Sequence, residues 1–137
     1  MRILGHGVDI VAVARVGRML EEHGDRFLER VFTAEERAYV AAAAGSRRAE
    51  HLAARFAAKE AAMKALGIGW TRGVAWTDVG VSREASGRPA LSVTGRFADL
   101  ARSRGVSEWW LSLSHTEAQA LASVIAVGEG ESGDPSE

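Results

Sequence analysis

Apolar residues recur at the spacing of an α-helix in the segment from Leu52 to Gly67. At about 100° per residue, one side of this helix carries the large side chains of Leu52, Phe56, Met63 and Leu66. The opposite side is nearly all alanine, at positions 54, 57, 58, 61 and 65. A helix with a large and a small apolar side is expected to pack on more than one side. The segment is therefore predicted to be the central helix of the fold.

Charged residues interrupt this pattern. Lys59 falls in the middle of the large apolar stripe, Glu60 lies on its edge, and Lys64 follows one turn beyond Glu60. Because an unpaired buried charge is costly, these groups are expected to be paired or to bind something. In the alternative interpretation, Lys59 extends its ammonium to water and Glu60 pairs with Lys64 on the surface, worth about 0.2–0.5 kcal/mol.

Residues 3–11 alternate with the period of a strand. Leu4 and His6 belong to one face, and Gly5, Gly7 and Asp9 to the other. The second face is thus bare backbone that ends in a carboxylate, which predicts room for a ligand against it. The alternative is a glycine bulge with Asp9 capping the next helix, and both roles of Asp9 are compatible.

The other elements follow from periodicity and turn residues. Helices are predicted at 13–22, at 26–32 and, from a capping box of Thr33 and Glu36, up to residue 44, with a loop at 45–50. Strands are predicted at 74–81 and 90–93, joined by a turn at 86–89, and at 109–114 and 120–127. Thr94 is expected to cap a short helix at 96–104.

These elements predict an α+β fold in which a mostly antiparallel sheet packs against the long central helix. Residues 1–127 are expected to form a single domain, and the polar residues 128–137 a disordered tail.

The strand at 109–114 divides its side chains between two faces. Trp109, Leu111, Leu113 and His115 alternate with Trp110, Ser112, Ser114 and Thr116. A serine next to a histidine also raises the possibility of a Ser-His hydrolase. That interpretation is disfavoured, because neither serine lies on a strand-to-helix elbow.

Composition narrows the chemistry. The chain has 137 residues, a net charge of −1, no cysteine and four scattered histidines. A balanced charge gives no reason to expect nucleic acid as a partner, and the lack of cysteine excludes disulfides, thiolate nucleophiles and thiolate-bound zinc. Any metal is expected to be a hard cation on carboxylate oxygens. No apolar run is long enough to cross a bilayer and no signal pattern opens the chain, so we expect a cytoplasmic protein without membrane association.

Three segments, taken in this order, resemble the holo-acyl-carrier-protein synthase family, the small phosphopantetheinyl transferases. They are Gly5-His6-Gly7-Val8-Asp9, Arg55-Phe56-Ala57-Ala58-Lys59-Glu60-Ala61 and Leu113-Ser114-His115, with Gly87-Arg88-Pro89 between the last two. The resemblance covers about residues 2–127, and it is specific because the motifs occur together. His6, where the family usually has an aliphatic residue, and Thr116, where an acidic residue is frequent, depart from the pattern.

The resemblance implies transfer of 4′-phosphopantetheine from coenzyme A to a serine of apo-acyl carrier protein, for fatty acid biosynthesis, with release of adenosine 3′,5′-bisphosphate. Attack on a pyrophosphate requires its charge to be neutralised, and Mg²⁺ takes only one or two protein carboxylates. Asp9 and Glu60 supply such a pair. Lys59 or Lys64 is expected to contact phosphate oxygens, although Lys59 has a structural ion pair as its alternative.

The remaining site residues come from the resemblance alone. It implies that Arg55 and His115 bind the adenosine and 3′-phosphate end of the coenzyme. Gly67, Arg88 and Pro89 are expected to form walls of the coenzyme cleft. The general base stays open between Glu60 and a water on the metal.

Two partners are implied as well. Acyl carrier proteins are acidic, and the resemblance points to docking by the first helical region through Arg15, Arg18, Met19, Arg26 and Phe27, with ordinary solvated helix faces as the alternative. Short family members are homotrimers with sites between subunits. Tryptophans on both faces of the strand at 109–114 agree with this, because both faces then need cover.

Two other functions remain open from the residues. One is a non-catalytic oligomeric module that binds a nucleotide in the same cleft. It is disfavoured because a binder of anions gains nothing from two carboxylates unless a metal joins them. The other is a metal-dependent pyrophosphate hydrolase, which would need no surface for docking a protein.

Overall fold

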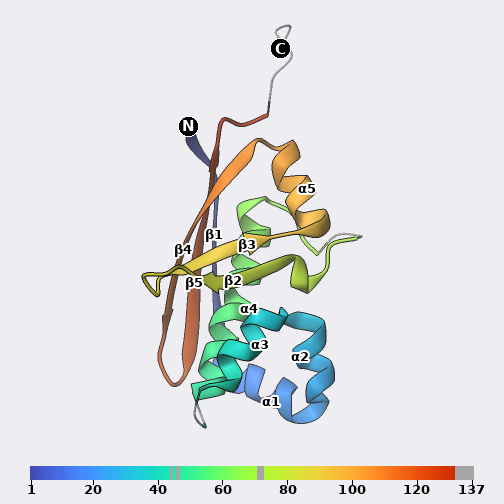
Figure 1. Cartoon of the computed structure of the whole chain (residues 1–137), viewed down its shortest axis with the longest axis vertical. Helices are drawn as coiled ribbons and strands as arrows, with labels where there is room; N and C mark the ends of the chain where they lie inside the picture. The colour runs from blue at the N-terminus through green and yellow to red at the C-terminus, as the bar shows by residue number, and fades with distance from the viewer. Residues whose placement is uncertain (44, 46, 71–72, 132–137) are drawn as a thin grey trace, which may run out of the picture.

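The computed structural model describes residues 1–43, 45, 47–70 and 73–131 of the chain (Figure 1). Its elements in chain order are β1 (Arg2–Ala12), α1 (Val13–His23), α2 (Asp25–Val31), α3 (Ala34–Ala41), α4 (Arg47–Ala65), the 3₁₀ helix η1 (Trp76–Asp78), β2 (Val79–Arg83), β3 (Pro89–Val93), α5 (Gly95–Ser103), β4 (Val106–His115) and β5 (Gln119–Gly128). Within the described residues no helix is long and apolar enough to cross a membrane.

The strands form two antiparallel sheets. The larger has the order β1-β5-β4, and the smaller pairs β2 with β3. Figure 1 shows α1–α3 gathered at the end of the molecule opposite the start of β1 and the end of β5. Helix α4 contacts the larger sheet, the smaller sheet, α1 and α3, and nearly all of its residues from Leu52 onward are buried. The predicted α+β fold around a central helix is confirmed.

The bare face of β1 packs against α4. A Cβ atom at Gly5 would lie 1.9 Å from the carbonyl oxygen of Ala65, and one at Gly7 would lie 1.9 Å from that of Ala61. The expectation that this face leaves room for a ligand is therefore wrong at both glycines, because the backbone of α4 fills the space. Only Asp9, farther along the same face, reaches past the helix.

Several predicted boundaries are corrected. Helix α4 begins at Arg47 within the predicted loop, α3 ends at Ala41, and the predicted strand from residue 74 is replaced by η1 up to Asp78. Thr33 and Glu36 form the predicted capping box, with bonds of 3.1 and 2.9 Å.

The predicted cap by Thr94 is wrong. Its hydroxyl bonds to the carbonyl of Asp78, and the carboxylate of Asp78 accepts from the Phe97 amide at 3.2 Å in its place.

The end of the chain is ordered for longer than predicted. Strand β5 continues to Gly128, which is buried against Gly105, and Gly130 lies against Arg2. The expected disorder therefore does not begin at residue 128, and residues 132–137 lie outside the described residues.

Gly7→Ala tests the contact between α4 and β1. The added methyl group would meet the helix backbone, so we expect the free energy of unfolding to fall by about 3 kcal/mol or more in urea denaturation. Gly17→Ala is the matched control, since Gly17 lies inside α1 with nothing within 4 Å of the added atom. That change should stabilise the protein by about 0.5–1 kcal/mol. Equal stabilities of the two variants would mean that the close approach is not needed.

Candidate functional site

Lys59 lies in the core rather than in a cleft. Its side chain and that of Glu36 are both 0% exposed, and the Lys59 ammonium donates to Glu36 Oε1 at 2.7 Å. It also donates to the carbonyl of Trp76 at 3.3 Å and to that of Val79. Burial lowers the pKa of Lys59, while Glu36 opposes the shift. All three hydrogens of the Lys59 ammonium are bonded within the protein, so the structure gives Lys59 the structural role. Its placement among the coenzyme ligands is corrected for this reason.

Glu36 completes this buried pair from α3. Its carboxylate accepts hydrogen bonds from the Thr33 amide at 2.9 Å and the Val81 amide at 3.0 Å, besides that from Lys59. The capping box identified Glu36 as the start of a helix, but the pattern gave no sign of its bonds to α4 and β2. One carboxylate thus joins three elements.

Asp9 and Lys64 meet where β1 packs against α4. The Lys64 ammonium donates to Asp9 Oδ1 at 3.0 Å and to the Val8 carbonyl at 3.1 Å. Glu60 lies one turn before Lys64 on the same side of α4, and its carboxylate accepts from the Trp70 indole at 3.4 Å. The Lys64 side chain is 54% exposed and that of Asp9 is 17% exposed. The structure therefore brings Lys64 to Asp9, and the helical spacing places Glu60 on the same side of α4 as Lys64.

The two carboxylates fit the donor set that Mg²⁺ uses. Among the described residues, no group of three or more histidine or acidic side chains is placed to hold a metal. A site with two carboxylates leaves most of an octahedral coordination shell to water and to phosphate oxygens of a substrate, as Mg²⁺ prefers. Asp9 and Glu60 would hold such an ion, with Lys64, bonded to Asp9, as a further cation.

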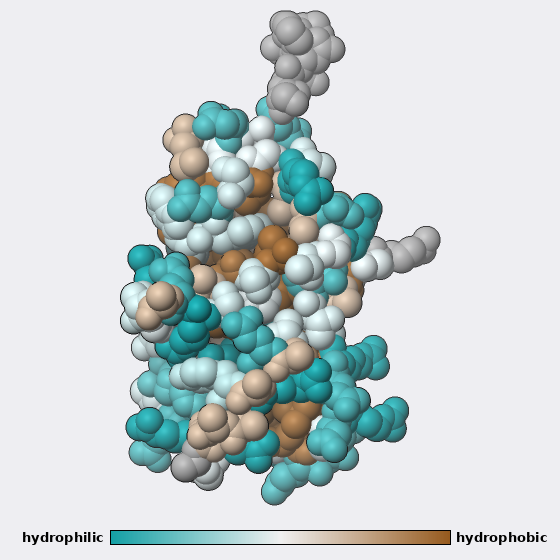
Figure 2. All heavy atoms as spheres, viewed as in Figure 1, coloured by the Kyte–Doolittle hydropathy of each residue, from teal (hydrophilic) through white to brown (hydrophobic). Residues whose placement is uncertain are grey.

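A groove of about 530 Å³ begins at Glu60 and runs along α1 and α2. Its lining includes Arg15, Met19, Arg26 and Phe27, four of the five residues predicted to dock a carrier protein. Figure 2 shows hydrophobic side chains surrounded by hydrophilic ones over the end of the molecule that α1–α3 form. Arg18 is exposed on α1 outside the groove lining. The predicted docking residues and a predicted metal ligand therefore share one surface.

An aromatic stack supports this groove. Phe56 stacks on Trp76 with ring centroids 5.0 Å apart, and Trp76 lies 3.8 Å from Trp70. The guanidinium of Arg15 lies 5.5 Å from the centre of the Phe56 ring. Sequence reasoning gave no role to Trp70, which lies outside every predicted element, or to Trp76, which it placed in a strand where the structure has η1.

Arg55 and His115 belong to a second group, at the N-terminal half of α4. His115 Nδ1 lies 3.1 Å from Glu50 Oε1, and Arg55 donates to the His51 carbonyl at 3.2 Å. Arg55 is only 1% exposed and burial lowers its pKa. The resemblance gave no role to His51, which lies between these two residues.

The other predicted wall residues lie elsewhere on the chain. Arg88 and Pro89 line a cavity of about 150 Å³ between the β2–β3 hairpin and β4. Gly67 follows α4 at a φ of 69°, a left-handed conformation that favours glycine. Gly67 therefore does not share the cavity that Arg88 and Pro89 line.

Both departures from the family pattern have local roles. His6 Nε2 lies 2.9 Å from Ser123 Oγ on the outer face of the larger sheet. The Thr116 hydroxyl accepts from the amides of Ala118 and Gln119, both at 3.2 Å, and so closes the β4–β5 turn.

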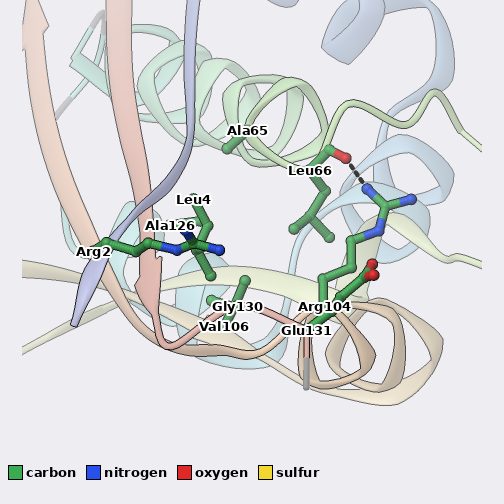
Figure 3. Close-up of a pocket in the computed structure, with 9 residues that line it drawn as sticks. All are labelled: Arg2, Leu4, Ala65, Leu66, Arg104, Val106, Ala126, Gly130 and Glu131. Carbon is green, nitrogen blue, oxygen red and sulfur yellow. Dashed lines mark hydrogen bonds between the residues drawn. The ribbon is translucent and has the colours of Figure 1, made fainter. Parts of the chain in front are cut away.

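Another cavity, of about 360 Å³, lies at the C-terminal end of α4 (Figure 3). Arg2 and Arg104 line it, and Arg104 donates to the Leu66 carbonyl, which closes the end of the helix. None of the predicted site residues lines this cavity.

Residues 5–124 match the family model of the 4′-phosphopantetheinyl transferase superfamily. The chain is 49% identical over 123 residues to the holo-[acyl-carrier-protein] synthase of Koribacter versatilis, which covers 90% of this chain and 97% of that relative.

Solved structures are similar as well. The holo-[acyl-carrier-protein] synthase of Neisseria meningitidis superposes with a TM-score of 0.83 at 34% identity, covering 92% of this chain and 99% of that one. The holo-(acyl-carrier-protein) synthase of Bacillus anthracis in complex with CoA (3′,5′-ADP) gives a TM-score of 0.74 at 35% identity, covering 95% and 98%.

Lys59→Met and Lys64→Met separate a structural lysine from a site lysine. The first leaves the Glu36 carboxylate buried without its counter-charge, so the free energy of unfolding should fall by about 3–5 kcal/mol. The second removes an exposed ammonium and should change stability by less than about 1 kcal/mol. Thermal and urea unfolding measure both. Wild-type stability of Lys59→Met would contradict the structural role.

Proposed function

Because the chain belongs to the 4′-phosphopantetheinyl transferase superfamily, we infer that it transfers 4′-phosphopantetheine from coenzyme A to a serine of apo-acyl carrier protein. The resemblance seen in the sequence is thereby confirmed. The observation that carries the mechanism is that Lys64 bonds to Asp9 and lies one turn beyond Glu60, which lines the groove along α1 and α2. A phosphate centre and a protein substrate can meet there.

The reaction exchanges one bond to phosphorus for another. The serine oxygen attacks the phosphorus that carries pantetheine, and the bond from this phosphorus to the bridging oxygen breaks. Adenosine 3′,5′-bisphosphate leaves with the bridging oxygen, and the serine hydroxyl gives up its proton. Mg²⁺ held by Asp9 and Glu60 would neutralise charge on the phosphate oxygens.

Lys64 contributes a mobile positive charge to this centre. Its ammonium donates to Asp9 and to the Val8 carbonyl, and the Lys64 side chain is 54% exposed. Its long side chain can turn from Asp9 to a phosphate oxygen, where it stabilises the leaving bisphosphate. Lys59 is the wrong lysine for this role, because its hydrogens are bonded in the core.

The coenzyme-binding residues suggest a site shared between copies of the chain. Arg55 and Glu60 are five positions apart and project about 140° from each other around α4. A coenzyme molecule bound to both Arg55 and Glu60 of one chain would have to extend around α4, which is buried. We therefore propose that Asp9, Glu60 and Lys64 of one copy act with the Arg55 and His115 region of a neighbour.

The outer face of the larger sheet supports such an assembly. Four apolar residues are exposed on it, namely Val8 at 44%, Ile10 at 57%, Trp110 at 43% and Leu121 at 37%. An apolar patch of this kind on a sheet is typical of a surface that another subunit covers. Trp109 on the inner face packs on Phe97 with ring centroids 5.5 Å apart, so only Trp110 remains for a partner. We propose a homotrimer.

Light scattering tests this assembly at micromolar concentration. The wild type should give three times the mass of one chain, and Trp110→Glu should give a smaller species with reduced transfer activity, because the shared site is then incomplete. A monomeric wild type with full activity would contradict the shared site.

Asp9→Asn and Glu60→Gln test the metal-binding pair. Each should lower the rate of transfer by about two orders of magnitude, because several kcal/mol of charge stabilisation are lost, while stability changes little. Mass spectrometry of apo-carrier protein with coenzyme A and Mg²⁺ measures the added phosphopantetheine. Binding of Mg²⁺, followed by calorimetry with coenzyme A present, should weaken in both variants.

The same assay separates the three functions. Free adenosine bisphosphate without modified carrier would indicate a hydrolase. No reaction, with coenzyme still bound, would indicate a binding module.

Arg15→Glu tests the docking groove. The charge reversal should raise the apparent KM for the acidic carrier protein about tenfold and flatten the salt dependence of the rate, because an attractive charge becomes repulsive. The KM for coenzyme A should stay within about twofold of wild type, since Arg15 lines the groove proposed to bind the carrier protein. Arg102→Glu, the same charge change on α5, is the control. Equal effects on both substrates would contradict docking at this groove.

A further inference from the structure

His51 lies at the centre of a cationic cluster that α3, α4, β2 and β4 build together. Its ring is 5.4 Å from the ring of Tyr39 and 5.5 Å from that of His115, in edge-to-face geometry with both. The guanidinium of Arg55 lies 4.3 Å from the centre of the Tyr39 ring, and that of Arg83 lies 4.6 Å from it. Three cationic or potentially cationic side chains thus surround one tyrosine, and a fourth, His115, contacts His51.

The cluster has little negative charge of its own. Among the described residues, Glu50 lies 3.1 Å from His115, and the charge of Glu36, which is bonded to Lys59, also acts on Arg55. Arg83 donates to the Tyr39 hydroxyl at 2.8 Å and to the Gly87 carbonyl at 2.6 Å, and Arg55 to the His51 carbonyl at 3.2 Å. Within the described part of the chain, Arg55 Nε is buried without a hydrogen-bond partner. Such an excess of positive charge favours an anion.

His51 is held in its neutral form by these surroundings. Burial of the ring, and then the positive charges of Arg55, His115, Arg83 and Arg47, lower its pKa below the ordinary value of 6.5. The groups that face it are Tyr39 from α3, Arg47, Glu50 and Arg55 from α4, Arg83 from β2 and His115 from β4. A dianionic phosphate next to these cations would reverse the sign of the local field.

We propose that His51 takes up a proton and becomes a further ligand of the coenzyme when the 3′-phosphate of coenzyme A binds at this cluster. The proposal rests on the proposed function, which brings a phosphomonoester to Arg55 and His115. His51 and His115 are both partly exposed, whereas Arg55 is buried beneath Tyr39, so the two imidazoles are accessible to a ligand. Arg55 then acts as a positioning residue, through Tyr39 and the His51 carbonyl.

The direction of the pH effect follows from this linkage. Proton uptake on binding means that the pKa of His51 is higher in the complex than in the free protein. At pH values between the two, the complex carries more protons than the free protein. Affinity for a ligand with the 3′-phosphate should therefore be highest below the pKa of the free protein. It should weaken by up to about tenfold as the pH rises through this interval. His51→Gln should flatten this dependence, whereas His115→Gln should weaken binding and leave the affinity dependent on pH.

Proton NMR of the imidazole resonances tests the proposal directly, with His51→Gln to assign the signal. Adenosine 3′,5′-bisphosphate at saturation should raise the titration midpoint of His51 by about one unit or more, while His23 on α1 should not move. Dephospho-coenzyme A, which lacks the 3′-phosphate, should bind without raising the midpoint of His51.

Each outcome decides a separate question. If the bisphosphate binds and the midpoint of His51 stays constant, the proposal is wrong and the proposed function stands. An equal rise with dephospho-coenzyme A would also overturn it, because the 3′-phosphate would not be the cause. If neither ligand binds to the wild type, the proposed function fails together with the inference.

Discussion

The close approach of α4 to β1 is the constraint on which the rest of this molecule depends. Two glycines on β1 leave their α-carbons bare where the carbonyl oxygens of Ala61 and Ala65 pass, and a methyl group at either position would overlap the helix backbone. This contact sets the depth at which the helix lies on the sheet. It also brings Lys64 close enough for its ammonium to bond to Asp9, which lies two residues beyond Gly7. The catalytic geometry is therefore a consequence of backbone packing.

The opposite side of α4 is fixed by polar contacts. The buried pair of Lys59 and Glu36 ties the helix to α3 through the capping box and to β2 through the Val81 amide. A buried ion pair contributes more to specifying one arrangement than to net stability, because the desolvation of both charges offsets much of their attraction. With apolar contact on one side and directional bonds on the other, α4 has little freedom to rotate. Glu60 and Lys64 thus keep a fixed orientation toward Asp9 and the groove.

The packing of α4 leaves three surfaces of different chemistry. The carboxylate cluster with Lys64 suits a phosphate centre, and the groove of arginines and aromatic rings suits an acidic protein. The cationic cluster around Tyr39 suits the far phosphate of a long coenzyme. The first two adjoin at Glu60, and the third lies on another side of α4. In the proposed trimer, the uncovered apolar face of the larger sheet would join them across subunits.

The sequence by itself determined the class of fold, the central helix and the residues of the carboxylate pair, because periodicity and local motifs are properties of neighbouring positions. The capping box at Thr33 was found in the same way, whereas the docking residues proposed on the first helices came from the family resemblance. Only the tertiary structure decided between Lys59 and Lys64, since both lie on one helix and differ in what other elements bring beside them. It also closed the glycine face of β1, gave Asp78 the role expected of Thr94 and placed His51 among cations from three elements. Those contacts join positions far apart in the chain, and no local pattern records them.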